Sequence, residues 1–190
     1  MKNKSKKELK QTMTKNLSNP LFEAITTGEN QALKLYAILD AARSSNIYMQ
    51  IDIVEHYNLF GEDVAEMLEE AAPYLVELDQ EEVFTKSMLQ EEYGNASMLF
   101  VYSTHDMETL ATFFRSYTTV DVDGQQAFFA FYDPRVFERF MKRASSEELE
   151  SFYSLVSCYA CEKSTDTDYL VLYEYKDKVV SKEIQVKESD

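Results

Sequence analysis

The sequence predicts an α/β (α+β) protein, with an N-terminal mixed β-sheet lobe and flanking helices, then a smaller helical lobe with a C-terminal β-hairpin. Two observations predict this class. Short apolar runs of strand length alternate with segments of helical periodicity as far as Asp133. Beyond Asp133, two helical segments are followed only by strand patterns. A chain of 190 residues can bury roughly 70% of its unfolded surface, so it needs no disulfide or metal to fold.

We divide the chain where this pattern changes. Residues 1–16 are predicted to be a disordered basic tail, because lysines dominate them. Residues 17–133 form the predicted α/β lobe. Residues 134–190 contain the second helical segment and the C-terminal strands, and 190 residues are enough for one domain or for two such small lobes.

The elements of the first lobe follow from apolar spacing and turn residues. The run from Leu35 is typical of a buried strand that closes on Asp40, whereas residues 47–60 are ambiguous, with a helix favoured. Asp106 or Thr104 is expected to cap a helix. The other expected elements are a short helix at 64–71, a strand at 73–79, an amphipathic helix at 81–94 that Gly94 ends, a strand at 97–103, a helix at 106–117, and a strand, tight turn and strand over 118–133.

The second lobe begins with two helices. The first is expected at 134–144, and Ser145 and Glu148 fit a capping box for the second. A strand around 154–163 and a terminal hairpin at 168–186 complete the chain. Alternation in that hairpin places Leu170, Leu172 and Glu174 on one side, and Tyr169, Val171, Tyr173 and Tyr175 on the other.

The junction of the two lobes lies in the stretch FAFYDPRVFERF. Tyr132 is expected to end an aromatic strand, since Pro134 cannot continue a central strand but suits the first turn of a helix. Asp133 is then a good N-cap, because its carboxylate can accept free N–H groups of that turn. Arg135 extends from the first turn and can reach back to a carboxylate or out to a partner.

Charge is the strongest compositional feature. The chain has 34 acidic and 19 basic residues, a net charge of −15. Six of the lysines lie within residues 1–16, so the rest of the chain is more acidic still. Such a body repels nucleic acid and anionic lipid. Two interpretations stay open: a surface for a basic protein partner, or plain solubility.

Several function classes lose support from what the sequence lacks. No glycine-rich phosphate loop occurs, which argues against a nucleotide enzyme. No apolar run of about 18 residues occurs, so we expect no membrane insertion. The lysine-rich N-terminus has no following apolar segment, which predicts a cytoplasmic protein rather than a secreted one.

Candidate catalytic groups are few. Cys158 and Cys161 form one C-x-x-C, which is half a zinc site, and strand-like alternation puts the two thiols on opposite faces. We expect two ordinary thiols, one buried and one not. His56 and His105 have no supporting nucleophile motif. The sequence therefore predicts no cofactor, no metal, no catalytic residue and no small-molecule substrate.

Four charged residues stand at the edges of apolar elements, where a charge is partly desolvated and needs a partner: Asp40, Arg115, Asp133 and Arg135. One interpretation is a set of salt bridges at the corners of the fold. The other is a polar cluster at one edge of the sheet that is presented to another protein.

Four ordered segments resemble one known family. They are LYAILDAARSSNIY at 35–48, AEMLEEAAPYLVELD at 65–79, LATFFRSYTTV at 110–120 and FFAFYDPRVFERFM at 128–141. Together they resemble the type VI secretion effector adaptors, the Tap/Tec chaperones, over residues 33–155. Ala130 departs from the arginine that is common in the family at that position.

The resemblance implies a cytosolic, non-enzymatic adaptor that binds a type VI secretion effector and helps load it onto the VgrG spike protein. It also implies which residues form the characteristic motifs and a partner-binding surface: Asp40, Arg115, Tyr132, Asp133, Pro134 and Arg135. Residues 134–190, the second lobe, are then expected to carry cargo specificity. Two alternatives stay open, an immunity-type protein that binds a basic toxin and a small thiol-redox enzyme that uses Cys158 and Cys161.

Overall fold

The computed structural model describes residue 17 and residues 20–23, 33–61, 64, 67–122 and 124–186. Its helices are α2 (Ser45–Ile51), α4 (Val83–Glu91), α5 (Met107–Arg115), α6 (Pro134–Arg143) and α7 (Ser146–Phe152), with a short 3-10 helix η2 (Glu69–Ala71). Its strands are β1 (Lys34–Asp40), β2 (His56–Asn58), β3 (Pro73–Glu77), β4 (Met98–Ser103), β5 (Thr119–Val122), β6 (Gln125–Phe128), β7 (Cys158–Lys163), β8 (Asp166–Lys176) and β9 (Lys178–Gln185).

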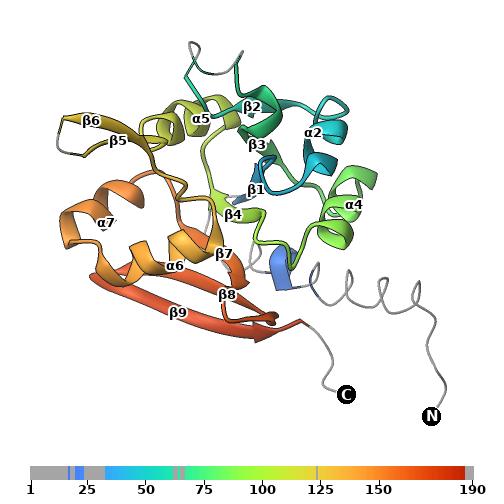
Figure 1. Ribbon diagram of the computed structural model, residues 1–190. Coiled ribbons are helices and arrows are strands. Elements are labelled where there is room, and N and C mark those ends of the chain that lie inside the picture. The colour runs from blue at the N-terminus through green and yellow to red at the C-terminus, as the bar shows by residue number, and fades with distance from the viewer. Residues whose placement is uncertain are drawn as a thin grey trace.

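A single seven-stranded sheet organises the described part of the chain. Its order is β2-β3-β1-β4-β7-β8-β9, and each neighbouring pair is antiparallel. β5 and β6 form a separate hairpin, which projects from the body of the molecule in Figure 1. The pairing of β4 with β7 joins strands from 17–133 and from 134–190 in one sheet. That these two segments act as separate lobes stays a prediction.

The sheet has an apolar core on each face, because side chains alternate along every strand. On one face, Leu35, Ala37 and Leu39 of β1 pack with residues of α2 and α4, and we call this the α4 face. On the other face, Tyr36 and Ile38 pack with residues of α5, α6 and α7, and we call this the α6 face. Figure 1 shows α6 close to β7 and β8, with α4 on the opposite side of the molecule.

The α+β class and its local signals are confirmed. The side chains of Asp106, Asp133 and Ser145 each accept a hydrogen bond from a backbone N–H in the first turn of the helix that follows. Glu148 completes the capping box. The terminal hairpin is also confirmed: Leu170 and Leu172 lie on the α4 face, and Val171, Tyr173 and Tyr175 lie on the α6 face.

The expected strand through Tyr132 is wrong. β6 ends at Phe128, and residues 131–133 form a turn in which the N–H of Asp133 donates to the carbonyl of Ala130 at 3.1 Å. The aromatic run leaves the hairpin because its rings fill the α6 core: Phe131 is fully buried and stacks on Phe114 with 5.6 Å between ring centroids. Burial of aromatic surface thus outweighs continued strand pairing.

Two helix expectations are modified. Residues 47–60, for which a helix was favoured, divide between α2 and strand β2, because β2 pairs with β3 at the edge of the sheet. Of the helix expected at 64–71, residue 64 is helical and η2 is a 3-10 helix, while residues 65–66 lie outside the described residues. The predicted basic tail at 1–16 also lies outside the described residues.

Candidate functional site

Asp133 is the centre of the predicted motif, and both the backbone and the side chain of Arg135 donate to its carboxylate. Its Oδ1 accepts the backbone N–H of Arg135 at 2.9 Å and the Nε–H of the same residue at 2.9 Å. The Nη2 of Arg135 donates to Oδ2, so the pair is bidentate. Pro134 occupies the first turn of α6 beside this cap. Asp133 therefore serves as N-cap and ion-pair partner together.

The pKa of Asp133 reflects that dual role. Burial alone would raise its pKa, but the hydrogen bonds from the side chain and backbone of Arg135 outweigh it and hold the pKa below its ordinary value. The carboxylate is thus charged at neutral pH. The guanidinium it holds is about half exposed, with 49% of the Arg135 side chain accessible. Arg135 is the member of the motif that a partner can reach.

Asp40 lies at the end of β1 and is buried, with 5% of the residue exposed. Its Oδ1 accepts the N–H of Ala42 at 3.0 Å. Burial raises its pKa to about 6; the Ala42 hydrogen bond opposes the rise, and the charge of Asp133 adds to it. Asp40 therefore titrates near physiological pH, unlike an ordinary aspartate.

Tyr132 completes the group. It is buried, and burial raises its pKa above the ordinary value, with further increases from the charges of Asp40 and Asp133. These electrostatic couplings place four side chains around the end of β1 and the start of α6. We call this group, Asp40, Tyr132, Asp133 and Arg135, the β1–α6 corner. Pro134 shapes its backbone.

Arg115 lies elsewhere. It ends α5, and its Nε and Nη2 both donate to the carbonyl oxygen of Asn58, at 3.0 and 2.7 Å. This clamp ties α5 to the end of β2. The structure therefore brings five of the six predicted residues together and gives the sixth a separate structural role at the β2 edge.

Sequence reasoning missed two charged residues near these elements. Arg43, three residues after Asp40, lowers the pKa of both Asp40 and Asp133 through its charge. Glu162 on β7 is buried, and its carboxylate accepts the N–H groups of Gly94 and Ala96 at 2.5 and 2.9 Å. The sequence signal for Glu162 is an acidic residue within an alternating strand pattern. A carboxylate that such a strand buries needs hydrogen-bond donors.

The two thiols lie on opposite faces of the sheet, as the strand alternation predicts. Cys158 is half-buried on the α4 face and Cys161 is buried on the α6 face. Burial raises the pKa of Cys158 to about 12, and that of Cys161 well above its ordinary value. Nucleophilic and redox thiols need a lowered pKa. The pKa values of both thiols are therefore shifted in the direction opposite to that of a reactive pair.

The two histidines serve packing and backbone contacts. His56 stands edge-on to Tyr74 with 5.4 Å between ring centroids, and its Nδ1 lies 3.0 Å from the carbonyl of Val54. The carbonyl of His105 accepts the hydroxyl of Tyr36 at 2.7 Å. Within the described ranges, no three or more His, Cys, Asp or Glu side chains are arranged to hold a metal. No described helix has the length and apolar character that crossing a bilayer requires.

Fold and site together define an α+β protein whose distinctive polar residues are held by structural contacts. Residues 35–151, more than half of the chain, match the family model described as Domain of unknown function (DUF4123). The chain belongs to this family, which is known among type VI secretion effector adaptors. Comparisons with curated proteins and with solved structures each found no match.

Proposed function

We propose that the protein is a non-enzymatic cytoplasmic adaptor that binds a type VI secretion effector and helps load it onto the VgrG spike. The observation that carries this proposal is the family match over residues 35–151, which contains all six motif residues. The β1–α6 corner is compatible with it, because Arg135 is oriented by Asp133 and remains half exposed. An oriented, accessible guanidinium is a suitable contact for a carboxylate or a backbone carbonyl on a partner.

Exposed apolar side chains support a protein-binding role as well. Large apolar residues that are exposed to solvent occur on and just after α2, before η2, at the start of α4, on the β5–β6 hairpin and on β9: Met49, Ile53, Met67, Leu68, Val83, Val120, Phe128 and Val180. Aromatic residues and methionine are favoured in interface cores. We propose that cargo specificity lies within residues 134–190, which continue beyond the family match.

One alternative has a specific observation in its favour. The net charge of −15 suits an immunity-type protein that covers a basic toxin. The thiol-redox alternative loses its main support, since burial raises the pKa of both thiols instead of lowering it.

The direct test is co-purification with any effector or VgrG protein that the genes adjacent to this one encode. The adaptor hypothesis predicts a stable complex with the effector, and loss of effector secretion when the gene is deleted. An immunity protein would instead protect sister cells from the toxin and leave secretion unchanged. Failure to bind any neighbouring effector or spike protein would overturn the adaptor assignment.

A further inference from the structure

The outer half of the α4 face forms a pocket. In β8 and β9, paired positions place Leu172 opposite Lys182 and Glu174 opposite Val180, so these side chains share one face. The next pair on the same face of the sheet is Leu170 opposite Ile184. Val180 is 47% exposed. A row of apolar side chains on an open sheet face is a surface that another element can cover.

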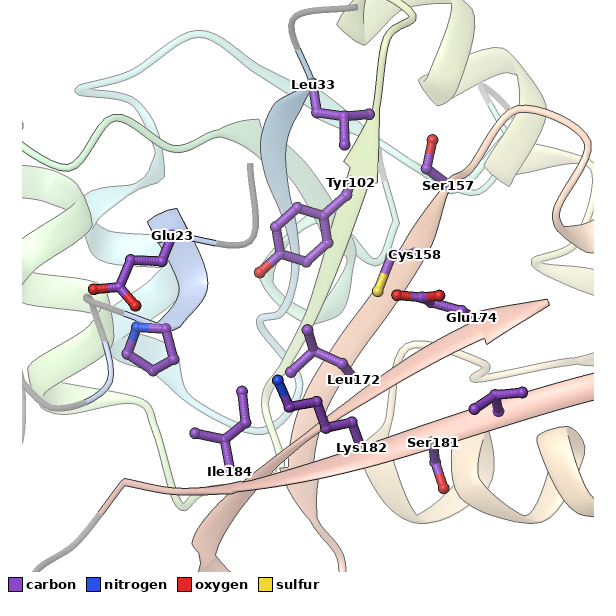
Figure 2. A pocket seen from close by; sticks show the side chains of 12 residues that line it. Glu23, Leu33, Tyr102, Ser157, Cys158, Leu172, Glu174, Ser181, Lys182 and Ile184 are labelled. Atoms are coloured by element: carbon purple, nitrogen blue, oxygen red, sulfur yellow. The ribbon is translucent and has the colours of Figure 1, made fainter. Parts of the chain in front are cut away.

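The pocket encloses about 540 Å³. Its floor comes from β4, β7, β8 and β9, and helical residues 20–23 with Leu33 stand beside it. Figure 2 shows the side chains of Lys182 and Ile184 rising from β9 into the space between the strands and Glu23. Cavities of about 300–1,000 Å³ are the usual size of ligand sites, so this one is large enough to receive several side chains of a partner.

Three polar side chains around the pocket have partners within the protein. The hydroxyl of Tyr102 donates to the carbonyl of Leu21 at 3.0 Å, and Glu174 pairs with Lys176 at 2.6 Å. The Cys158 thiol donates to the carbonyl of Tyr159 at 3.3 Å. Lys182 makes no ion pair within the described part of the chain and is exposed. The pocket thus offers apolar surface and the ammonium group of Lys182, with the carboxylates of Glu23 and Glu174 also in its lining.

We propose that this pocket binds an amphipathic helix of the cargo effector, with its apolar side chains on Leu172, Val180 and Ile184 and one carboxylate on Lys182. The inference rests on the proposed adaptor function and names the surface that recognises the cargo. It also places recognition on β8 and β9, within the segment that follows the family match.

A helix fits this surface better than an extended peptide. The same sheet face is already covered by helices α2 and α4 at its other end, so a helix laid over β8 and β9 would continue that layer. An extended peptide would instead pair with β9, which has β8 as its one neighbour among the described strands, and would leave the pocket empty. Because the whole chain is acidic, the helix should be neutral or basic apart from the carboxylate that meets Lys182.

The test uses the full-length protein as bait for a display library of 14-residue peptides. The library fixes apolar residues along one helical face and randomises the other positions. Lys182→Glu and Val180→Asp are the test variants. Lys178→Glu and Thr112→Asp are matched controls, because Lys178 is an exposed lysine of the same strand and Thr112 is an exposed β-branched residue on α5, and neither lines the pocket.

The expected result is a set of enriched helical peptides that carry an acid beside the apolar face. Their affinity should fall at least tenfold with Lys182→Glu and with Val180→Asp, and by less than twofold with either control. No enriched peptide, equal binding to test and control variants, or peptides that bind in extended form would overturn the proposal.

The neighbour-encoded effector separates this proposal from the adaptor function. If the wild-type protein binds the effector and the pocket variants bind it equally well, the adaptor function stands and the pocket assignment fails. If the wild-type protein binds pocket-dependent helical peptides but not the effector, the adaptor function fails and the helix-binding pocket stands with a different cargo.

Discussion

Arg135 binds Asp133 with its backbone and its side chain at once. The N–H and the Nε–H of Arg135 both reach Oδ1 of Asp133 at 2.9 Å, while the guanidinium also reaches Oδ2. One carboxylate therefore satisfies an open donor of the first turn of α6 and fixes the orientation of a half-exposed cation. The two roles can be separated by substitution.

Replacing Asp133 with Ala removes both roles. Loss of an N-cap typically costs about 0.5–2 kcal/mol, and a domain stable by about 5–15 kcal/mol should survive that loss. We expect a folded, less stable protein, measured by urea denaturation, with cargo secretion reduced more than expression. Unchanged stability together with unchanged cargo binding would show that Asp133 neither caps nor orients a contact.

Asp133→Asn is the matched variant, because an amide oxygen can still cap the helix but carries no charge for Arg135. It should retain most of the stability and lose the ordered guanidinium. If cargo binding depends on that guanidinium, the Asn and Ala variants will bind equally poorly although their stabilities differ.

Arg115→Ala should loosen the β2 edge. The substitution removes two hydrogen bonds to the Asn58 carbonyl, each worth about 0.5–1.5 kcal/mol at most in an exposed position. Backbone hydrogen exchange across 56–58 should become faster, with little change in β4. Arg139→Ala is the control, since Arg139 is also exposed and donates its Nε–H to the carbonyl of Arg135 on α6. If exchange across residues 56–58 is equally fast in both variants, the hydrogen bonds from Arg115 do not stabilise this edge of the sheet.

These contacts show where sequence reasoning succeeded. The caps at Asp106, Asp133 and Ser145 involve partners within three residues, so local residue order was enough to predict them. The alternation of the terminal hairpin is equally local, because side-chain direction in a strand depends only on position.

The same reasoning failed where distant packing decides. Arg115 clamps a carbonyl 57 residues away, and Glu162 accepts N–H groups from a loop 66 and 68 residues away. No local pattern encodes those partners. The aromatic neighbours of Tyr132 predict a strand, but burial of this aromatic segment against α5 and α7 determines its conformation. Propensity is overridden wherever tertiary burial is worth more.

Asp40 should make stability fall as pH rises. Its pKa is about 6 in the folded protein against an ordinary 3.8, so between these values the folded state binds more protons than the unfolded state. The free energy of unfolding therefore decreases with rising pH through that window and stays lower above it. Asp40→Asn removes this effect and should be more stable than wild type at pH 7.5 by about 1–2 kcal/mol, a figure discounted for partial solvent screening.

The measurement is urea denaturation of both proteins at pH 4, 5, 6 and 7.5. The stability difference between Asp40→Asn and wild type should grow up to about pH 6 and then level off. Glu150→Gln, which changes an exposed carboxylate on α7, should show no such growth. A difference that is constant across the series would mean that Asp40 has the same pKa in the folded and unfolded states and that its burial has no electrostatic cost.

The thiols should be slow to react. A rise in the pKa of Cys158 from 9.0 to about 12 lowers its thiolate fraction at pH 8 by roughly a thousandfold, and only the thiolate is nucleophilic. Alkylation of the native protein should therefore be far slower than that of a free thiol, and Cys161 should react only after unfolding. Rapid alkylation of Cys158 in the native protein would restore the redox alternative.

Salt dependence of cargo binding will decide whether charge or apolar burial dominates recognition. Exposed ion pairs are worth about 0–1 kcal/mol each and are screened over about 8–10 Å near physiological ionic strength, whereas aromatic and aliphatic anchors are insensitive to salt. The exposed Phe128, Val120 and Val180 favour an apolar interface, with the acidic body steering association. We therefore expect the association rate to fall with salt while the dissociation rate changes little, in a series extending to roughly 0.5 M. A loss of affinity by several decades, carried by the dissociation rate, would instead make the acidic body the main recognition surface.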